Sequence, residues 1–363
     1  MGITHGGDSV AGLRNNLREL AGAARSNVWV LAGTEAASGT PLRILFAGGD
    51  RQRDYWSRLA FAGDCTETPL GKVYLWQLLY LLRRNSQRCD LAVIEGRGLQ
   101  RRLYQGAGDF YLPLWVDSSV ELPLTPASKG AKEDLRRIRK HQLGYELTKD
   151  TQLLREFYDH MYLPTVRDRH GEQSHISRFE ELARALGRGD NQLLLVRHEG
   201  VAIAGVIIIK SAVPRLWLAG IRDSSMAYRR MGAVGATYHF PAQALAAEGF
   251  KRMDMGRSRP FFNDGVMNYK GKWNHRLDGF DSDGMVLRVL AASAAARGLL
   301  ARQPFAHLQD GRLHGAVFVD DAHSPPAESA AKEVASLRAL AGLAAVTVFA
   351  LDAATGKPHR LAR

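Results

Sequence analysis

The alternation of apolar and polar residues divides the first third of the chain into segments of strand length and segments with helical spacing. Short apolar runs that end in glycine-containing turns predict strands. A proline in the last run favours the edge of a sheet, because proline cannot donate to a ladder. These patterns predict helices at residues 9–24 and 73–84, strands at 42–47 and 91–94, and an edge strand at 111–116.

The middle of the chain carries a longer and more regular pattern. Three apolar runs, at residues 192–197, 201–209 and 215–221, are separated by short turns and predict an antiparallel meander. A helix at 230–248 and a strand at 250–255 then make a βαβ crossover with the last of these strands. Upstream, the pattern predicts a basic helix at 128–143, a strand at 145–148, a helix that follows Asp150 and is ended or bent by Pro164, and a helix at 177–186 capped by Ser177.

The end of the chain predicts a smaller unit, with strands at residues 315–319 and 345–351 around a helix at 327–340. This unit either stands alone or returns to complete the sheet of the N-terminal half. Runs of strands with intervening helices, and only one clear crossover, indicate an α+β protein. Its sheets are expected to be mixed, mainly antiparallel and flanked by helices.

Composition narrows the class of protein. A chain of 363 residues, 45% of them hydrophobic, can bury a full core. Its two cysteines fit neither a disulfide framework nor a zinc site, and no metal site is expected. No apolar run is long enough for a secretion signal or a transmembrane helix, which predicts a cytoplasmic protein or one peripheral to the inner membrane.

The net charge of +12 indicates a polyanionic partner. A nucleotide, a tRNA, an anionic lipid and a phosphate-bearing cofactor are all anionic, and the net charge alone does not choose among them. Stable DNA binding is not expected.

Residues 253–276 gather the most suggestive chemistry. The segment contains several cations, among them Arg257, Arg259 and Lys270. Between Arg257 and Arg276 its only carboxylate is Asp264. Four aromatic residues interleave with these cations, which favours a lined cleft that receives an anion over a solvated basic loop.

A second candidate is the glycine-bearing start of the helix at 230–248. The run Arg229-Arg230-Met231-Gly232-Ala233-Val234-Gly235 could bind phosphate through helix amides, the helix dipole and the two arginines. The alternative is that Gly232 and Gly235 are small only to permit close packing.

These motifs, in this order, resemble the FemAB-like branch of the GNAT acyltransferase superfamily. The resemblance spans residues 113–279 and departs from the family at Val234, where the GNAT pyrophosphate loop usually has glycine or alanine. It rests on the meander, Gly205, the basic run Leu135-Arg136-Arg137-Ile138-Arg139-Lys140, the run Phe157-Tyr158-Asp159-His160-Met161-Tyr162, and the endings Asp254-Met255-Gly256-Arg257-Ser258 and Tyr269-Lys270-Gly271-Lys272-Trp273.

The resemblance implies two GNAT-like halves and an acyl transfer onto an amine. The expected division is a degenerate half at residues 1–128, a catalytic half at 129–300 and an αβ extension at 301–363. Acyl-CoA, such as acetyl-CoA, is the expected donor, and the expected acceptor is an amine related to the cell envelope or to polysaccharide synthesis. The alternatives are an aminoacyl-tRNA-dependent transferase of the Fem type and a non-catalytic anion-binding scaffold.

Site residues follow from the same resemblance. Lys270, with Tyr269 before it, matches the FemAB-like aromatic-lysine pair, and Lys270 would stabilise an oxyanion or hold a phosphate. Asp254, in the strand beside the expected cleft, would be the base, or else a helix cap or an arginine partner. The oxyanion donor is expected among the backbone amides of residues 215–221. Acyl-CoA would be held by Arg229, Arg230, Gly232 and Gly235, and the acceptor by Arg257, Arg259, Tyr162 and Arg167.

Overall fold

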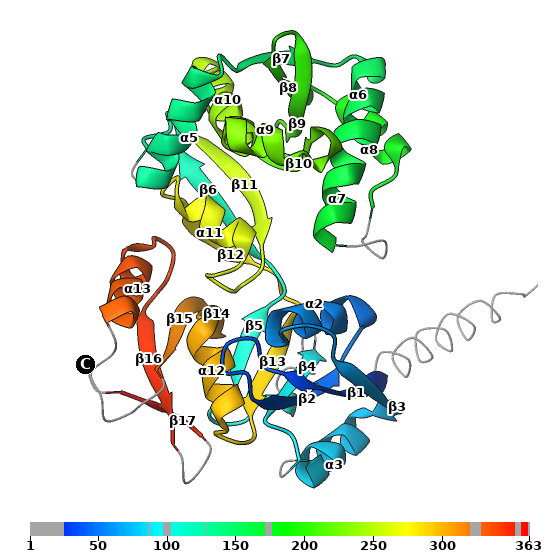
Figure 1. Ribbon diagram of the computed structural model, residues 1–363, viewed down its shortest axis with the longest axis vertical. Coiled ribbons are helices and arrows are strands. Elements are labelled where there is room, and N and C mark those ends of the chain that lie inside the picture. Colours follow the sequence, from blue (N-terminus) through cyan, green and yellow to red (C-terminus); the bar gives the residue numbers. More distant parts are fainter. Residues whose placement is uncertain are drawn as a thin grey trace, which may run out of the picture.

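The computed structural model describes residues 25–85, 88–96, 103–126, 128–170, 176–319, 328–352 and 357–361. The helix expected at residues 9–24 lies outside these ranges. Within them, no helix is both long and apolar enough to cross a bilayer. Three sheets organise the chain, and the two larger ones form separate halves, one above the other in Figure 1.

The six-stranded sheet of the first half has the order β3-β1-β2-β4-β13-β5. Its only parallel pair is β2 with β4, and β5, which contains Pro113, lies at the edge as predicted. Two helices accompany it, α2 (Asp50–Ala60) and α3 (Leu75–Asn85). The strands are β1 (Arg25–Thr34), β2 (Pro41–Ala47), β3 (Thr66–Tyr74), β4 (Leu91–Gly96), β5 (Phe110–Pro113) and β13 (Gly284–Val289).

The seven-stranded sheet of the second half has the order β12-β6-β11-β10-β9-β8-β7. The predicted meander is confirmed as β8, β9 and β10, and the predicted crossover as the parallel pair β10 and β11. The mixed, mainly antiparallel α+β class is therefore confirmed. The strands are β6 (Val116–Glu121), β7 (Gly144–Thr148), β8 (Gln192–His198), β9 (Val201–Ile209), β10 (Arg215–Ile221), β11 (Arg252–Ser258) and β12 (Arg276–Phe280).

Helices cover both faces of this sheet, which is why β8 and β9 are apolar almost throughout. Along β8, Leu194 and Val196 pack into the core beneath α5 (Lys129–Lys140) and α10 (Ala233–Ala247). Leu193 and Leu195 pack into the core on the opposite face. That face is covered by α6 (Thr151–Phe157), a π-helical turn η1 (Tyr158–Tyr162), α7 (Leu163–His170) and α8 (Phe179–Leu186).

The chain passes between the two large sheets twice. It leaves the six-stranded sheet after β5 and enters the seven-stranded sheet at β6, and it returns from β12 to β13. The first half therefore contains a strand, β13, that is distant in sequence from the rest of it, whereas the strands of the second half, β6 to β12, follow one another along the chain. The division at residues 128 and 300 stays a prediction.

The C-terminal strands form a four-stranded sheet of their own, in the order β14-β15-β16-β17, and do not extend the six-stranded sheet by hydrogen bonds. Phe305, Phe318 and Phe349 instead join the same core as Phe110 and Leu112 of the first half. The extension is thus packed onto that half. Its elements are α12 (Ala294–Arg302), β14 (Phe305–Gln309), β15 (Arg312–Val319), α13 (Glu328–Ala339), β16 (Val346–Leu351) and β17 (Pro358–Arg360).

The helix expected at residues 230–248 is present as α10, but it begins later than expected. Two helices, α9 (Met226–Met231) and α10, meet at Gly232, whose φ of 98° is left-handed. A residue in that conformation ends one helix and lets the chain change direction before the next begins. Gly232 is the cap of both.

Two other helix boundaries also differ from expectation. The helical path does not end at Pro164 but continues through η1 into α7, because the wider turn before the proline accommodates its missing N–H. The cap of α8 is Arg178 and not Ser177, since the Glu181 side chain accepts a hydrogen bond from the Arg178 N–H.

Gly220 of β10 gives a direct test of how the helical face packs on the sheet. A Cβ on Gly220 would lie 2.4 Å from the Met161 carbonyl carbon in η1. We expect Gly220→Ala to lower the free energy of unfolding by about 1–3 kcal/mol, because the backbone has no flexible side chain to move aside. Urea denaturation would measure it.

Gly144→Ala is the matched control, because Gly144 is also in a strand and a Cβ there would meet nothing within 4 Å. Equal stability of the two variants would contradict the close contact between η1 and β10.

Candidate active site

The parallel strands β10 and β11 are paired at one position only. Arg215 pairs with Asp254, whose N–H donates to the Pro214 carbonyl at 2.8 Å, and no register pair follows. The two strands therefore diverge towards their carboxyl ends. On its other side β10 has a bulge against β9, where Trp217 and Leu218 fall between two paired positions.

The peptide group of Gly256 is taken out of the ladder at the point of divergence. In a regular strand its N–H and C=O would again face β10, two residues after Asp254. Instead the N–H donates to Asp254 Oδ1 at 2.7 Å, and the carbonyl accepts from Lys270 Nζ at 2.6 Å. Gly256 has a φ of 78° and a Cβ there would lie 3.0 Å from the Leu216 carbonyl oxygen, so glycine is required.

Lys270 is the buried cation of this site. Only 1% of it is exposed, and its amine also donates to Ser118 Oγ of β6 at 3.3 Å. It is carried by α11 (Gly265–Gly271), which Asp264 caps by accepting from the Val266 and Met267 N–H groups. Burial lowers the pKa of Lys270 to about 7, although the charges of Asp254, Asp117 and Asp264 act in the opposite direction. At neutral pH this amine can therefore hold or accept a proton.

Asp254 is engaged at both carboxylate oxygens. Oδ1 accepts from Gly256 and Oδ2 forms a close ion pair with Arg215. Asp117 of β6 continues the network, 4.0 Å from Arg215 and 3.4 Å from Arg257. The structure therefore gathers Lys270, Asp254 and Arg257, and gives Asp254 the arginine partner that was the alternative to a base.

Tyr269 points away from Lys270, although the two are adjacent in sequence. Its hydroxyl donates to Asp134 Oδ2 of α5 at 2.7 Å, and burial together with the Asp134 charge raises its pKa. Neighbouring residues of a helix project about 100° apart, so α11 serves two different places. The Tyr269 hydroxyl lies near Gly235 at the start of α10.

The glycine-bearing turn is packed against α5. A Cβ on Gly235 would lie 2.8 Å from Asp134 Cβ, and one on Gly232 would lie 3.0 Å from Arg137 Cβ. Both glycines thus permit a close helix–helix contact, which was the alternative to phosphate binding. The first turn of α10 has no side-chain cap, so its amides remain suited to an anionic ligand.

The two arginines before this turn differ in their surroundings. Arg229 donates to Ser224 Oγ at 2.5 Å and pairs with Asp168 at 3.1 Å, whereas Arg230 is exposed. Both arginines lie in the last turn of α9, and Arg229 reaches back to η2 (Arg222–Ser224), where Asp223 and Ser224 have positive φ. Such backbone strain is frequent at functional sites.

The remaining expected substrate residues lie elsewhere. Arg259 reaches the first half, where it is stacked between Tyr55 and Trp115 at 4.3 and 4.2 Å and donates to Gln52 at 2.8 Å. Tyr162 is buried, and its hydroxyl accepts from the Ser177 N–H at 3.1 Å. Arg167 is exposed on α7.

Sequence reasoning missed Asp117, Ser118 and Arg215. Asp117 and Ser118 belong to β6, which is more than 130 residues from β11 in the sequence but pairs with it. Their neighbourhood carries no local motif. Arg215 stands at the start of an apolar run, a pattern that predicts only a solvent-exposed arginine at the beginning of a strand.

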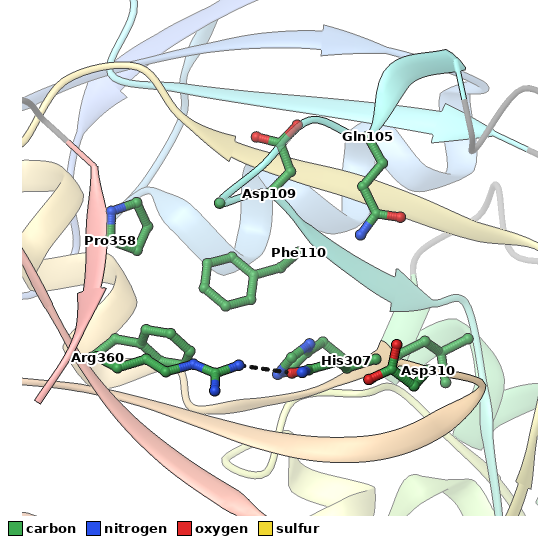
Figure 2. A pocket seen from close by; sticks show the side chains of 11 residues that line it. Gln105, Asp109, Phe110, His307, Asp310, Pro358 and Arg360 are labelled. Carbon is green, nitrogen blue, oxygen red and sulfur yellow. Dashed lines mark hydrogen bonds between the residues drawn. The ribbon is translucent and has the colours of Figure 1, made fainter. Parts of the chain in front are cut away.

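A cavity of about 480 Å³ lies outside this site, between β5 and the C-terminal sheet. Figure 2 shows Phe110, His307 and Arg360 among its lining residues, with Arg360 bonded to Gln309. Burial lowers the pKa of His307 to about 4, so that imidazole is neutral. None of the predicted site residues lines this cavity.

No group of three or more His, Cys, Asp or Glu side chains is placed to hold a metal ion anywhere in the described ranges.

Comparison with known proteins identifies one domain. Residues 128–271 match the family described as an acetyltransferase (GNAT) domain, which confirms the resemblance to the GNAT superfamily for that segment. No curated protein matches the chain.

Several solved structures resemble the chain at low identity. FemX is 10% identical over 69% of this chain and 81% of its own, with a TM-score of 0.39. The C-terminal domain of a putative lysylphosphatidylglycerol synthetase from Agrobacterium fabrum is 14% identical over 74% and 82%, with a TM-score of 0.35. A GCN5-related N-acetyltransferase from Anabaena variabilis is 12% identical over 80% and 71%, with a TM-score of 0.32.

The burial of Lys270 predicts a pH-dependent stability. Between its folded pKa of about 7 and its ordinary value of 10.5, the unfolded chain binds more protons, so this group makes the protein more stable as pH rises through that window. Lys270→Met removes the group. Its free energy of unfolding relative to the natural protein should fall by about 2 kcal/mol from pH 6 to pH 9.

Urea denaturation of both proteins at several pH values would measure this difference. A difference that stays constant over that range would contradict the lowered pKa. The loss of two hydrogen bonds in the variant does not interfere, because it is independent of pH.

Proposed function

From the premise that residues 128–271 are a GNAT acetyltransferase domain, we propose that this protein is an N-acyltransferase that moves an acyl group from acyl-CoA to an amine. The observation that carries the proposal is the divergence of β10 and β11 beside the buried Lys270. An opening at the carboxyl ends of parallel strands is where ligands bind in open sheets that contain a crossover.

The donor's phosphates would be held at the start of α10. The uncapped amides of its first turn and the two preceding arginines, Arg229 and Arg230, supply positive potential there. Gly232 and Gly235 shape this turn by letting α5 approach closely. Their role in donor binding is therefore indirect.

The proposed reaction is a direct attack without a covalent enzyme intermediate. The amine nitrogen bonds to the thioester carbonyl carbon, the carbon–sulfur bond breaks, and the sulfur leaves with the electron pair and takes up a proton as the thiol. Backbone amides of the β10 bulge at Trp217 and Leu218 would stabilise the oxyanion.

Lys270 would act as the proton acceptor in its neutral form. Its pKa of about 7 lies where a general base is most effective, and Asp254, occupied by Arg215 and Gly256, would position the surrounding backbone instead. Tyr269 would orient α11 through Asp134.

One observation, the exposed cations of α5, favours the aminoacyl-tRNA-dependent alternative. Helix α5 exposes a row of cations on the side opposite to its buried Ala131 and Ile138. Binding of bulk tRNA at low salt that weakens steeply with added salt would favour this alternative, because phosphate contacts release counterions. The exposed cations are Lys129, Lys132, Arg136, Arg139 and Lys140.

The envelope- or polysaccharide-related acceptor and the cytoplasmic or membrane-peripheral location remain proposals drawn from the sequence.

Titration with acetyl-CoA and with CoA tests the donor. We expect saturable heat for both ligands and a higher unfolding temperature in their presence, because a ligand that binds only the folded state stabilises it. No heat and no protection would refute the acyl-CoA-dependent activity, and would leave the scaffold alternative.

Lys270→Met tests the proposed base. We expect kcat to fall by about 100-fold to 10,000-fold, as for other general bases, while acetyl-CoA affinity is retained. In the natural protein kcat/KM should rise with pH through about 7, as Lys270 loses its proton. Stopped assays of CoA release would record both.

Lys272→Met is the matched control, because it removes a cation two residues away that is paired with Asp134 at 3.5 Å. If both variants lose activity equally, Lys270 has no special role in proton transfer.

A further inference from the structure

A second cavity lies directly beside the strand pair of the proposed active site. It has a volume of about 420 Å³ and is bounded by α8 on one side and by strands β9 and β10 on the other. Its size is that of a small-molecule site and not of a macromolecular groove. Its lining includes Glu181 and Arg184 of α8, Arg188 of the turn that follows α8, and Ile209, Arg215 and Trp217 of the sheet.

The wall of this cavity formed by α8 and the turn after it carries two cations and one carboxylate. Glu181 and Arg184 lie on the exposed face of α8 and Arg188 follows in the turn, while Leu182 and Leu186 are buried on the other face of the helix. Within the described residues, neither Arg184 nor Arg188 is paired with a carboxylate. Glu181 accepts a hydrogen bond from the Arg178 N–H, and Arg184 Nε donates to the Glu180 carbonyl, which leaves the two terminal nitrogens of Arg184 and the guanidinium of Arg188 to face an anion.

The floor of the cavity is apolar and aromatic. Ile209 is paired with Arg215, and Trp217 lies two residues further along β10, so the three side chains share one face of the sheet. The charge of Arg215 is compensated by Asp254 behind it. A ligand in the cavity would therefore lie on Trp217 and meet the cations Arg184 and Arg188, which are not paired with a carboxylate among the described residues.

The cavity is connected to the reacting region by short contacts. Trp217 is the first residue of the β10 bulge, at the place where β10 and β11 part. From Arg215 a chain of contacts runs to Asp254, to Gly256 and to Lys270. A molecule held above Trp217 is thus adjacent to the proposed proton acceptor's network.

We propose that this cavity is the acceptor site and that the acceptor is a small amine carrying a carboxylate or phosphate group. The anionic group binds Arg184 and Arg188, and the stem lies on Trp217, which places the amine towards the opening between β10 and β11. Guanidinium forks bind planar anionic oxygens in bidentate fashion and repel a second cationic group on the acceptor. The inference rests on the acyltransferase activity proposed above.

Paired acceptors test the inference. With acetyl-CoA as donor, γ-aminobutyrate is compared with butylamine, and phosphoethanolamine with ethanolamine, by the rate of CoA release. We expect kcat/KM for the anionic member of each pair to be at least about tenfold higher, as one charge-assisted contact provides. In the double variant R184Q/R188Q this preference should disappear, while the rates with butylamine and ethanolamine stay unchanged.

The double variant R51Q/R58Q is the control. It removes the same formal charge from exposed positions of another helix, α2 in the first half, and should keep the preference. A loss of preference in both double variants would attribute it to overall charge and overturn the assignment to this cavity. So would equal rates with the charged and uncharged members of each pair in the natural protein.

Failure of the underlying activity gives a different result. If acetyl-CoA does not bind and no amine is acylated, the acyltransferase proposal fails. Calorimetric titration with phosphoethanolamine and γ-aminobutyrate then tests whether the cavity binds an anion. Saturable binding that is lost in R184Q/R188Q supports an anion site above Trp217. No binding to the natural protein overturns it.

Discussion

The capture of one peptide group determines the geometry of the second half. The Gly256 N–H is held by the Asp254 carboxylate, and its carbonyl by the Lys270 amine, so neither is left for β10. Unpaired backbone groups inside a protein are costly, and side chains can end a ladder only where they replace its hydrogen bonds. The pair β10–β11 therefore ends after Arg215 and Asp254, and the sheet opens there.

That arrangement also explains why a lysine is buried. Removing an ammonium group from water is unfavourable, and the carboxylates of Asp254, Asp117 and Asp264 offset the cost only in part, so the pKa of Lys270 falls to about 7. Replacement by a hydrophobic residue of similar size would often be more stable. A buried amine with a pKa near neutrality is instead what proton transfer requires, so the same interaction opens the sheet and supplies the proposed base.

Helix α11 links this site to the donor-binding turn. Lys270 points to Gly256 and β6, whereas Tyr269 points to Asp134 and the start of α10. The contact of α5 with Gly235 fixes the position of that start. Neighbouring elements of the second half thus fix the relative positions of the turn, the opening in the sheet and the cavity above Trp217. Arg259, which directly follows β11, extends from there into the first half.

The sequence by itself determined the elements whose pattern is local: the meander β8–β10, the crossover to β11 and the basic helix α5. It also singled out Lys270, Asp254 and Arg257, which the structure brings together. It did not reveal that Asp117 and Ser118 of β6 lie beside β11, or that Lys272 pairs with Asp134 of α5. Only the tertiary structure decided these, because strand pairing and charge compensation join residues more than a hundred positions apart, and no local periodicity records which partner a strand or a cation meets.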